Sequence, residues 1–412
     1  PGTLTQDNVT GVVFGSELTR TGDISTSNTL VNQLYSNIIW GQRGNFLSIP
    51  TDCPQRDERL GWTGDVQVFS RVSTLNYNVS SFLPEFVKNL GSEQYSNGEI
   101  EDAFPKAVYS AKNGSGWADA AIILPWTVYT AYGNRQVIYD NYNMMSKYYD
   151  SVAEDAGDSL VPTRNPYGDW LAYDANTPRE LISCAYFAYD ASLMSQMAAA
   201  IGKTSDSEQY EKQFEKIRSA FVSRFVNTSD GVISGNTQTD YVLALKFDLL
   251  PNENLRKKAA ERLAQRIKDA DNHLTTGFIG TAYLCEALSE NGYSETAYRL
   301  LETTTNPSWL YSVVNGATTT WERWDSYVAE TGTFGDASMN SFNHYAYGAV
   351  GAWLYQEAAG IQYDTENPGY KHFTIDPEPD ASMDNVSGSY DSVYGKIVSD
   401  WTPSGSSFTL HA

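Results

Sequence analysis

A helical repeat of apolar residues, which continues from about residue 23 to residue 360, limits the possible folds most strongly. In the segment 28–40, Leu30, Leu34 and Ile38 recur every four residues and therefore lie on one face of a helix. Segments 205–225 and 252–267 repeat the pattern. An apolar stripe must be buried against another element, so helices of this kind have to pack on one another. The sequence therefore predicts an all-α fold class over most of the chain.

Glycines divide this region into many short helices. Gly133, Gly202, Gly292 and Gly360 stand where the glycine after a helix is expected. Roughly ten to twelve antiparallel helices with short connections indicate a toroid of helical hairpins, although a bundle or an α-solenoid also fits the periodicity. Besides the three segments above, we predict helices over residues 81–90, 119–131, 138–152, 184–201, 277–289, 294–302 and 342–358.

The two ends of the chain differ from the helical region. Residues 9–24, "VTGVVFGSELTRTGDI", alternate weakly and predict a strand, while "KIVSDW" and "SFTLHA" flank the turn "TPSGS" and predict a hairpin. We therefore predict three parts. Residues 1–22 form a leading β segment or a linker from a preceding domain, residues 23–360 form the helical domain, and residues 361–412 form a partial β-sandwich.

The charge of the chain limits its partners. With 50 acidic and 28 basic side chains, the formal net charge is −22, whereas a nucleic-acid or anionic-membrane surface requires a cationic protein. No run of eighteen apolar residues is present, so no membrane-spanning helix is expected. A neutral small molecule or oligosaccharide is the expected partner. The sequence leaves the oligomeric state open.

Cysteine usage and glycosylation triplets bear on location. Cys53, Cys184 and Cys285 are too scattered for a disulfide framework, and we predict three separate thiols. The chain begins "PGTLTQ" without a signal peptide, which we interpret as a mature product or a trimmed piece. An extracellular location is expected because five N-x-S/T triplets permit secretion. These triplets begin at Asn8, Asn78, Asn113, Asn227 and Asn385.

The most unusual local feature is residues 49–66, "IPTDCPQRDERLGWTGDV". Four carboxylates, two guanidiniums and an indole crowd into this segment, which is too charged for a core and too aromatic for a plain surface. Pro50 and Pro54 disfavour a helix. Neighbouring carboxylates in different environments allow a proton donor and a charged ligand-binding group to coexist. A functional site is favoured, and the alternative is a structural network of acids and arginines at helix ends.

Further acids stand beside tryptophans. In "GATTTWERWDSYV", Glu322 lies between Trp321 and Trp324, which suits the wall of a sugar site, although an acid capping a helix end also fits. Indole faces stack on sugar rings, while Asp and His bind hydroxyl groups. Together these segments favour a carbohydrate ligand. The remaining pairs are Trp117 with Asp119, Asp169 with Trp170, and His344 with Trp353.

Patterns for other chemistry are missing from the sequence. It contains no G-x-S-x-G, Walker, dinucleotide-binding or H-E-x-x-H motif, and its histidines lack metal-ligand spacing. We therefore expect no metal and no cofactor.

Six blocks resemble one family, the α-L-rhamnosidases of glycoside hydrolase family 78, in the order of that family's catalytic domain. They are "NIIWGQRGNFLSIPTDCPQRDERLGWTGD", "GWADAAIILPWTVYTAYGN", "YGDWLA", "TTGFIGTAYLCEALSENGY", "PSWLYSVVNGATTTWERWD" and "SFNHYAYGAVGAWLY". The resemblance covers about residues 23–360 and implies an (α/α)6 barrel. Members of the family usually carry β-sandwich domains on both sides of the barrel, whereas this chain contains only parts of them.

The resemblance also implies residue roles in an exo-acting, inverting hydrolase that releases terminal α-L-rhamnose. Glu58 matches the general acid and Glu322 the general base. Asp57 is expected to be structural. The positions that match substrate-binding residues are Asp52, Arg56, Trp62, Asp65, Trp117, Trp170 and His344.

Inverting hydrolysis makes a geometric demand on Glu58 and Glu322. One must carry a proton and the other must be ionised, and a water between them sets their separation at roughly 6.5–9.5 Å. We expect Arg323 to keep Glu322 ionised. Because the two glutamates are far apart in sequence, only a closed fold brings them together. Another (α/α)6-barrel glycosidase or lyase, or a non-catalytic carbohydrate-binding protein, would also fit the residues.

Overall fold

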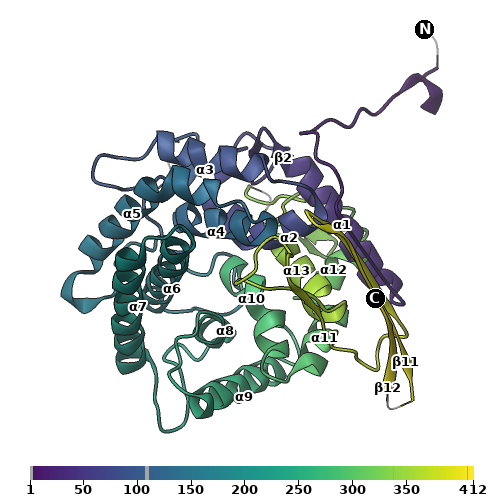
Figure 1. Ribbon diagram of the computed structural model, residues 1–412. Coiled ribbons are helices and arrows are strands. Elements are labelled where there is room, and N and C mark those ends of the chain that lie inside the picture. The colour runs from purple at the N-terminus through teal and green to yellow at the C-terminus, as the bar shows by residue number, and fades with distance from the viewer. Residues whose placement is uncertain (1–2, 107–110, 337, 406) are drawn as a thin grey trace.

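The structure is a computed structural model that describes residues 3–106, 111–336, 338–405 and 407–412. Its helices form a ring in which inner and outer helices alternate along the chain (Figure 1). Most residues of the inner helices are buried, as expected for helices surrounded by other elements. The inner helices are α2 (Thr63–Asn76), α4 (Ala120–Tyr132), α6 (Arg179–Ala200), α8 (Gln238–Lys246) and α10 (Phe278–Ser289).

The outer helices bury one stripe each. In α7, for example, the buried residues are Phe214, Ile217, Phe221 and Phe225, at spacings of three and four. This stripe is what the sequence periodicity detected. The outer helices are α1 (Thr29–Asn45), α3 (Phe82–Ser92), α5 (Gln136–Ala156), α7 (Thr204–Phe225), α9 (Glu253–Asp269) and α11 (Ser294–Glu302).

Residues 346–358 close the ring of inner elements. They form the 3-10 turn η3 (Ala346–Val350), the single turn α13 (Gly351–Trp353) and the π-helical turn η4 (Leu354–Ala358). η3 packs against both α2 and α10, so the inner elements contact one another in a complete circle. Gly351 permits this approach, since a Cβ there would lie 2.7 Å from Val72. This closed ring confirms the predicted toroid of helical hairpins. The two alternatives, a bundle and an α-solenoid, do not describe this fold.

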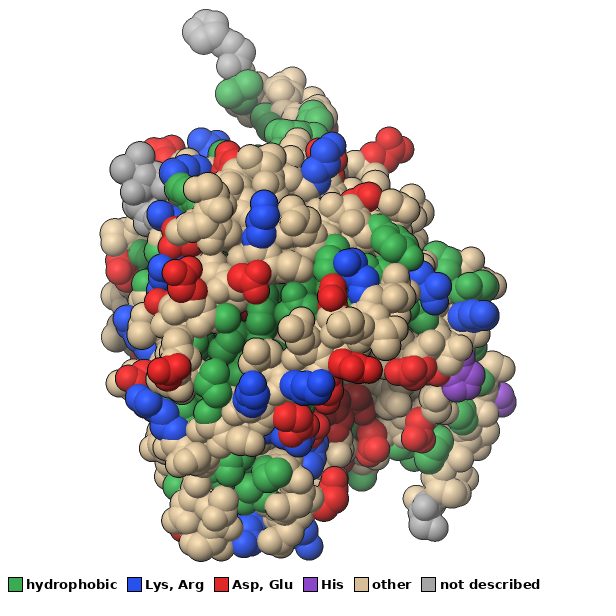
Figure 2. Space-filling view, turned by 60° about the vertical axis from the view of Figure 1, so that its left-hand side comes forward, with side chains coloured by type: hydrophobic (Ala, Val, Ile, Leu, Met, Phe, Trp, Pro, Cys, Tyr) green, Lys and Arg blue, Asp and Glu red, His purple; other side chains and the backbone are tan. Residues whose placement is uncertain are grey.

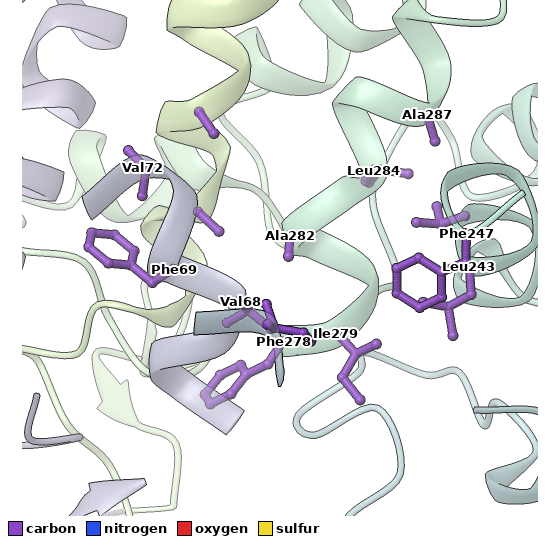
Figure 3. Close-up of a cluster of buried hydrophobic side chains, with 14 of the residues drawn as sticks. Val68, Phe69, Val72, Leu243, Phe247, Phe278, Ile279, Ala282, Leu284 and Ala287 are labelled. Carbon is purple, nitrogen blue, oxygen red and sulfur yellow. The ribbon is translucent and has the colours of Figure 1, made fainter. Parts of the chain in front are cut away.

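The core lies between the inner helices. Figure 3 shows Phe69 of α2, Phe247 directly after α8 and Phe278 of α10 among the side chains of one apolar cluster. All three are almost fully buried, and burying a side chain of this size stabilises a fold by about 1.5–3 kcal/mol. This packing fixes the ends of α2 and α10, on which site residues stand.

Three helices were not predicted: α2, α8 and the short α12 (Trp309–Val314). Nearly every residue of α2 and α8 is buried, including Ser, Thr, Gln and Asp side chains. A helix that is buried on all sides has no apolar stripe, so its period is invisible in the sequence. The helix predicted over 342–358 begins only at Ala346, in the 3-10 conformation.

The chain ends meet in one antiparallel sheet of order β1-β10-β11-β12. The strand predicted over residues 9–24 is largely wrong, because β1 covers only Gly22–Thr26 and the short turn η1 (Gln6–Asn8) precedes it. The predicted terminal hairpin is confirmed, although its turn residue 406 lies outside the described residues. The remaining strands of this sheet are β10 (Val386–Ser392), β11 (Gly395–Ser404) and β12 (Ser407–His411).

This sheet is anchored to the barrel through β11. The indole N–H of Trp401 donates to the Ala358 carbonyl at 2.7 Å, and the Ser399 hydroxyl donates to the Ala359 carbonyl at 2.6 Å. Both donors are buried, so both hydrogen bonds satisfy groups that would be costly to leave unpaired.

Short two-stranded ladders stiffen several connections between helices. The ladders are β2 (Phe46–Leu47) with β3 (Ile49–Pro50), β4 (Gly61–Trp62) with β5 (Ala103–Phe104), β6 (Tyr327–Val328) with β7 (Thr333–Phe334), and β8 (Ile361–Tyr363) with β9 (Phe373–Ile375). The 3-10 turn η2 (Gly157–Ser159) follows α5.

The surface of the molecule is hollowed on the face that Figure 2 shows, and acidic side chains gather in this hollow. None of the described helices is long and apolar enough to span a membrane.

Candidate active site

All nine residues that the sequence singled out as catalytic or substrate-binding line one cavity of about 200 Å³. They come from connections that lead into inner helices and from the first turns of those helices, so they gather at one end of the barrel. Residues hundreds of positions apart therefore share one small space. The nine are Asp52, Arg56, Glu58, Trp62, Asp65, Trp117, Trp170, Glu322 and His344.

The acidic segment is a closed loop followed directly by a helix. The Asp52 N–H donates to the Leu60 carbonyl and the Leu60 N–H donates to the Asp52 carboxylate, each at 2.9 Å. These two bonds pin the ends of a loop that carries Arg56 and Glu58. The chain then passes through β4 into α2, whose first turn contains Asp65. One continuous segment thus supplies five of the nine residues.

Arg56 joins the two glutamates. Its Nη2 lies 2.6 Å from Glu58 Oε2 and 3.4 Å from Glu322 Oε1, and its Nη1 lies 3.0 Å from Glu322 Oε2. The two carboxylate oxygens that share Nη2 are therefore no more than about 6 Å apart. This bound concerns one pair of oxygens only, so the separation of roughly 6.5–9.5 Å between the two carboxyl groups stays a prediction.

Glu58 is held at both oxygens. The Trp62 indole N–H donates to Oε1 at 2.8 Å, while Arg56 Nε and Nη2 donate to Oε2 at 3.0 and 2.6 Å. Three donors fix the orientation of this carboxyl group, and a positioned carboxyl group is what proton transfer to a substrate requires.

Glu322 is almost fully buried, with 2% of its surface exposed. Burial raises its pKa, against the opposing effect of the positive charges at His344 and Arg56. A carboxylate with a raised pKa is a stronger base toward water. The prediction that Arg323 pairs with Glu322 is wrong. Arg323 Nε donates to Asp325 at 2.9 Å, and Arg56 is the arginine that pairs with Glu322.

Asp52 lies on the floor of the cavity and is buried. Burial and the negative charge of Asp65 raise its pKa to about 7. The Cys53 thiol donates to Asp52 Oδ2 at 2.7 Å. Asp52 therefore changes protonation near neutral pH, where it can act as a hydrogen-bond donor or acceptor for a ligand.

Asp65 and His344 form a buried pair in which His344 Nε2 lies 2.9 Å from Asp65 Oδ1. Burial opposes the positive charge of His344, but the hydrogen bond to Asp65 and the carboxylates of Asp65, Glu322 and Asp52 together raise its pKa. The imidazolium form is thus favoured, which balances part of the negative charge of the site.

Aromatic rings form the rest of the wall and adjoin the charged groups where the Trp62 indole meets Glu58. The Tyr167 ring stands 4.4 Å from the Trp117 ring, 5.8 Å from that of Trp62 and 6.3 Å from that of Trp170, measured between centroids. One part of the cavity is therefore ionic and another apolar, an arrangement that suits a sugar with both hydroxyl groups and a C–H face.

Three lining residues were missed: Tyr167, Phe278 and Met339. Tyr167 lies three residues before Trp170 in "YGDWLA" and could have been found there. Phe278 looks like an ordinary core residue, and Met339 lies in a connection without a motif. The Met339 carbonyl accepts a hydrogen bond from Arg56 Nη1.

Several expected sugar-binding partners are structural instead. Asp119 is buried and accepts from the Tyr148 hydroxyl at 2.9 Å, and Trp353 is buried and donates to Ser289. Asp169 accepts backbone N–H groups at the start of α10. The Asp57 side chain is exposed and does not line the cavity, and its carboxylate lies 3.9 Å from Arg59; its expected structural role stays a prediction.

Asp52, Cys53 and Glu58 bring one potential metal-ligand atom each within 4.8 Å of one another. A metal would require the Cys53 thiolate, but burial and the Asp52 charge raise the pKa of that thiol. The Glu58 oxygen Oε2 also already accepts two hydrogen bonds from Arg56. The donor set therefore suits proton exchange better than metal binding. All three cysteines are buried and free, as predicted.

Buried carboxyl groups predict a fold that is more stable in mild acid. Burial raises the pKa values of Asp52, Asp102 and Asp240 to about 7. The unfolded chain releases these protons near pH 4, so raising the pH from 5 to 8 favours unfolding. The raised pKa of His344 acts in the same direction, because its stabilising charge is lost as the pH rises.

We expect the Tm from circular dichroism to be at least about 5 °C lower at pH 8 than at pH 5. Asp240→Asn, which removes one of these groups outside the cavity, should flatten the dependence. A Tm that increases from pH 5 to pH 8 would contradict this reading of the buried carboxyl groups.

Comparison with known proteins gives one consistent result. Residues 19–358 match the model of the bacterial alpha-L-rhamnosidase 6 hairpin glycosidase domain, and residues 360–412 match that of the bacterial alpha-L-rhamnosidase C-terminal domain. An alpha-L-rhamnosidase of Streptomyces avermitilis is 42% identical over 411 residues, and one of Formosa agariphila is 41% identical over 400 residues. The matches cover 100% and 95% of this chain but only 39% and 43% of those proteins.

Solved structures agree. The crystal structure of the Streptomyces avermitilis alpha-L-rhamnosidase complexed with L-rhamnose superimposes with a TM-score of 0.94 at 40% identity, covering all of this chain and 39% of that one. The native Aspergillus terreus enzyme gives a TM-score of 0.93 at 34% identity, covering 99% of this chain and 48% of that one. The chain thus spans less than half the length of these relatives. It belongs to the six-hairpin glycosidase family of bacterial alpha-L-rhamnosidases.

Proposed function

We propose that this chain carries the catalytic site of an exo-acting, inverting α-L-rhamnosidase. The observation that supports this most directly is that Glu58 and Glu322 meet at one small cavity through Arg56, beside an aromatic wall. Family membership and the rhamnose bound in the Streptomyces avermitilis structure support the choice of sugar.

Glu58 is the proposed general acid. It protonates the glycosidic oxygen as the bond to the anomeric carbon breaks, so the leaving group departs as a neutral alcohol. Trp62 and Arg56 hold the Glu58 carboxyl group in one orientation. This lowers the entropic cost of reaching the geometry in which the proton is transferred.

Glu322 is the proposed general base. It removes a proton from a water that attacks the anomeric carbon from the face opposite the leaving group, which inverts the configuration. Its raised pKa strengthens it as a proton acceptor, while Arg56 and His344 keep the carboxylate form accessible. In this proposal the sugar and the attacking water occupy the space between the two glutamates, both of which contact Arg56 in the free site.

The remaining lining residues hold the sugar in this proposal. Asp52, Arg56, Asp65 and His344 offer charged hydrogen-bonding groups for the hydroxyl edge. The indoles Trp62, Trp117 and Trp170 pack against the C–H face and the methyl group of a 6-deoxy sugar. A sugar with one apolar and one polar side matches a cavity that is divided in the same way.

The size of the cavity favours exo action. The cavity of about 200 Å³ is small beside the second cavity of about 770 Å³ in the same barrel, and it suits a single sugar ring. We therefore expect hydrolysis of terminal rhamnose and no hydrolysis when a further sugar is attached to that rhamnose.

The test is incubation of the chain with a natural rhamnosyl glycoside and with p-nitrophenyl rhamnoside, followed by chromatography. Release of free L-rhamnose from both is expected. Binding in isothermal titration without product would instead indicate a carbohydrate-binding protein, and an unsaturated uronate product from an acidic polysaccharide would indicate a lyase. Either of these results would refute the proposal.

A further inference from the structure

A second cavity, of about 770 Å³, lies inside the same barrel. α2 contributes Asp65 to the first cavity and Arg71 to the second, and α10 contributes Phe278 to the first and Glu286 to the second. At 1.5 Å per residue these positions are roughly 9 and 12 Å apart along their helices. The second cavity therefore extends toward the opposite end of the barrel, starting at Gln67 on α2, and shares no lining residue with the candidate active site.

The charged groups of this second cavity pair mainly with one another. Lys246 Nζ lies 3.0 Å from Glu286 and 2.5 Å from Glu290. Near the rim, Asp364 lies 2.8 Å from His372. Two acids share the single ammonium group of Lys246, so acidic side chains outnumber basic ones in the lining.

Arg71 and Glu378 are engaged as well. Arg71 donates to the Gln356 side chain and to the Tyr370 hydroxyl, each at 2.8 Å, and its guanidinium stacks on the Tyr363 ring at 3.6 Å. Glu378 accepts from the Ser294 hydroxyl at 3.0 Å. Arg71 Nη1, however, has no hydrogen-bond partner among the described residues, so this guanidinium still has an N–H group to offer a ligand.

Two atoms of the lining are buried without a hydrogen-bond partner among the described residues: Gln67 Oε1, an acceptor, and Arg71 Nη1, a donor. Buried polar atoms of this kind normally find a partner. The side chains of Glu357 and Trp126 and the hydroxyl groups of Tyr189 and Tyr283 line the same space, also without a hydrogen bond among the residues that the structure describes.

Glu357 is protonated at neutral pH, because burial and the charges of Glu286 and Glu290 raise its pKa to about 8. The unpaired groups are then a carboxylic acid, an amide oxygen, a guanidinium N–H, an indole N–H and two phenol hydroxyls, which together offer donors and acceptors beside aromatic rings. Within the described residues, the acids of this cavity do not bring three ligand atoms close enough for one metal ion.

We propose that this second cavity is a non-catalytic binding site for a neutral saccharide. Sugars offer hydroxyl groups that both donate and accept, and C–H faces that pack on aromatic rings, which is the complement of this lining. The volume admits a disaccharide or longer chain. Binding here does not depend on Glu58 or Glu322, so it is independent of the proposed hydrolysis.

Isothermal titration with L-rhamnose and with cellobiose, a neutral disaccharide, tests the site. We expect rhamnose to bind at two sites and cellobiose at one. Tyr283→Phe and Glu357→Gln should each weaken cellobiose binding by about three- to tenfold, the effect of losing one hydrogen bond. Both variants should keep wild-type kcat/KM on p-nitrophenyl rhamnoside. Tyr139→Phe, at an exposed tyrosine on α5, is the matched control and should change neither quantity.

Two outcomes would overturn the assignment. One is the absence of cellobiose binding together with a single rhamnose site. The other is binding of the organic cation spermidine, weakened by Glu357→Gln, in a protein that does not bind cellobiose. Wild-type activity in the Tyr283→Phe variant shows that the barrel is folded, so lost binding cannot be attributed to unfolding.

Discussion

Glu322→Gln is expected to lower the hydrolysis of a natural rhamnoside by at least about a hundredfold, the usual scale of general base assistance. The amide preserves the size of the side chain and can still bond to Arg56, but it cannot take a proton from water. Glu58→Gln should lower the same rate by a similar factor, because the glycosidic oxygen then departs without a proton. Steady-state kinetics on the natural glycoside measures both.

The two variants should differ on an activated substrate. The p-nitrophenolate group leaves without much acid assistance, so Glu58→Gln should recover part of its activity on p-nitrophenyl rhamnoside, whereas Glu322→Gln should not. Glu330→Gln, at an exposed position in the same connection, is the matched control and should keep full activity. Wild-type rates for either cavity variant would refute the assigned role.

Asp169→Ala is expected to destabilise the fold by about 3 kcal/mol or more. The buried Asp169 carboxylate accepts N–H groups from Gly277 at 2.8 Å, Ile279 at 2.9 Å and Gly280 at 3.2 Å, and a hydroxyl from Thr239. Removing it leaves these donors unpaired at the start of α10. Because its neighbours Trp170 and Phe278 line the cavity, KM should increase as well.

Thermal unfolding and kinetics together test this role of Asp169. Asp169→Asn retains an acceptor and should be less damaging than Asp169→Ala. Asp158→Ala, at an exposed position in η2, should leave Tm and KM unchanged. If Asp169→Ala lowered turnover without changing Tm, Asp169 would act on the sugar directly, as the pairing with Trp170 first indicated.

The sequence predicts the outer helices better than the inner ones, for a physical reason. Helices such as α7 and α9 bury one stripe and expose the rest, so their period is visible. In α2 nearly the whole helix is buried, and polar side chains such as Ser70 and Thr74 are satisfied by internal hydrogen bonds. Without a polar face there is no periodic signal, and α2 and α8 were missed.

The candidate site was predictable where acids and tryptophans are concentrated in short blocks. These blocks do not show which side chain of one block contacts which side chain of another. Arg56, rather than the adjacent Arg323, contacts Glu322, because loop closure between Asp52 and Leu60 carries the guanidinium across the cavity. Asp169 has the same local sequence signature as a ligand-binding acid, and only the position of α10 identifies it as a structural group.

Proton NMR of the hydrolysis, recorded during the first minutes, is the most direct measurement of the central claim. If Glu58 supplies a proton on one face of the sugar while Glu322 activates water on the other, the β-anomer of L-rhamnose appears first and the α-anomer follows by mutarotation. First appearance of the α-anomer, or release of a different sugar, would contradict the account.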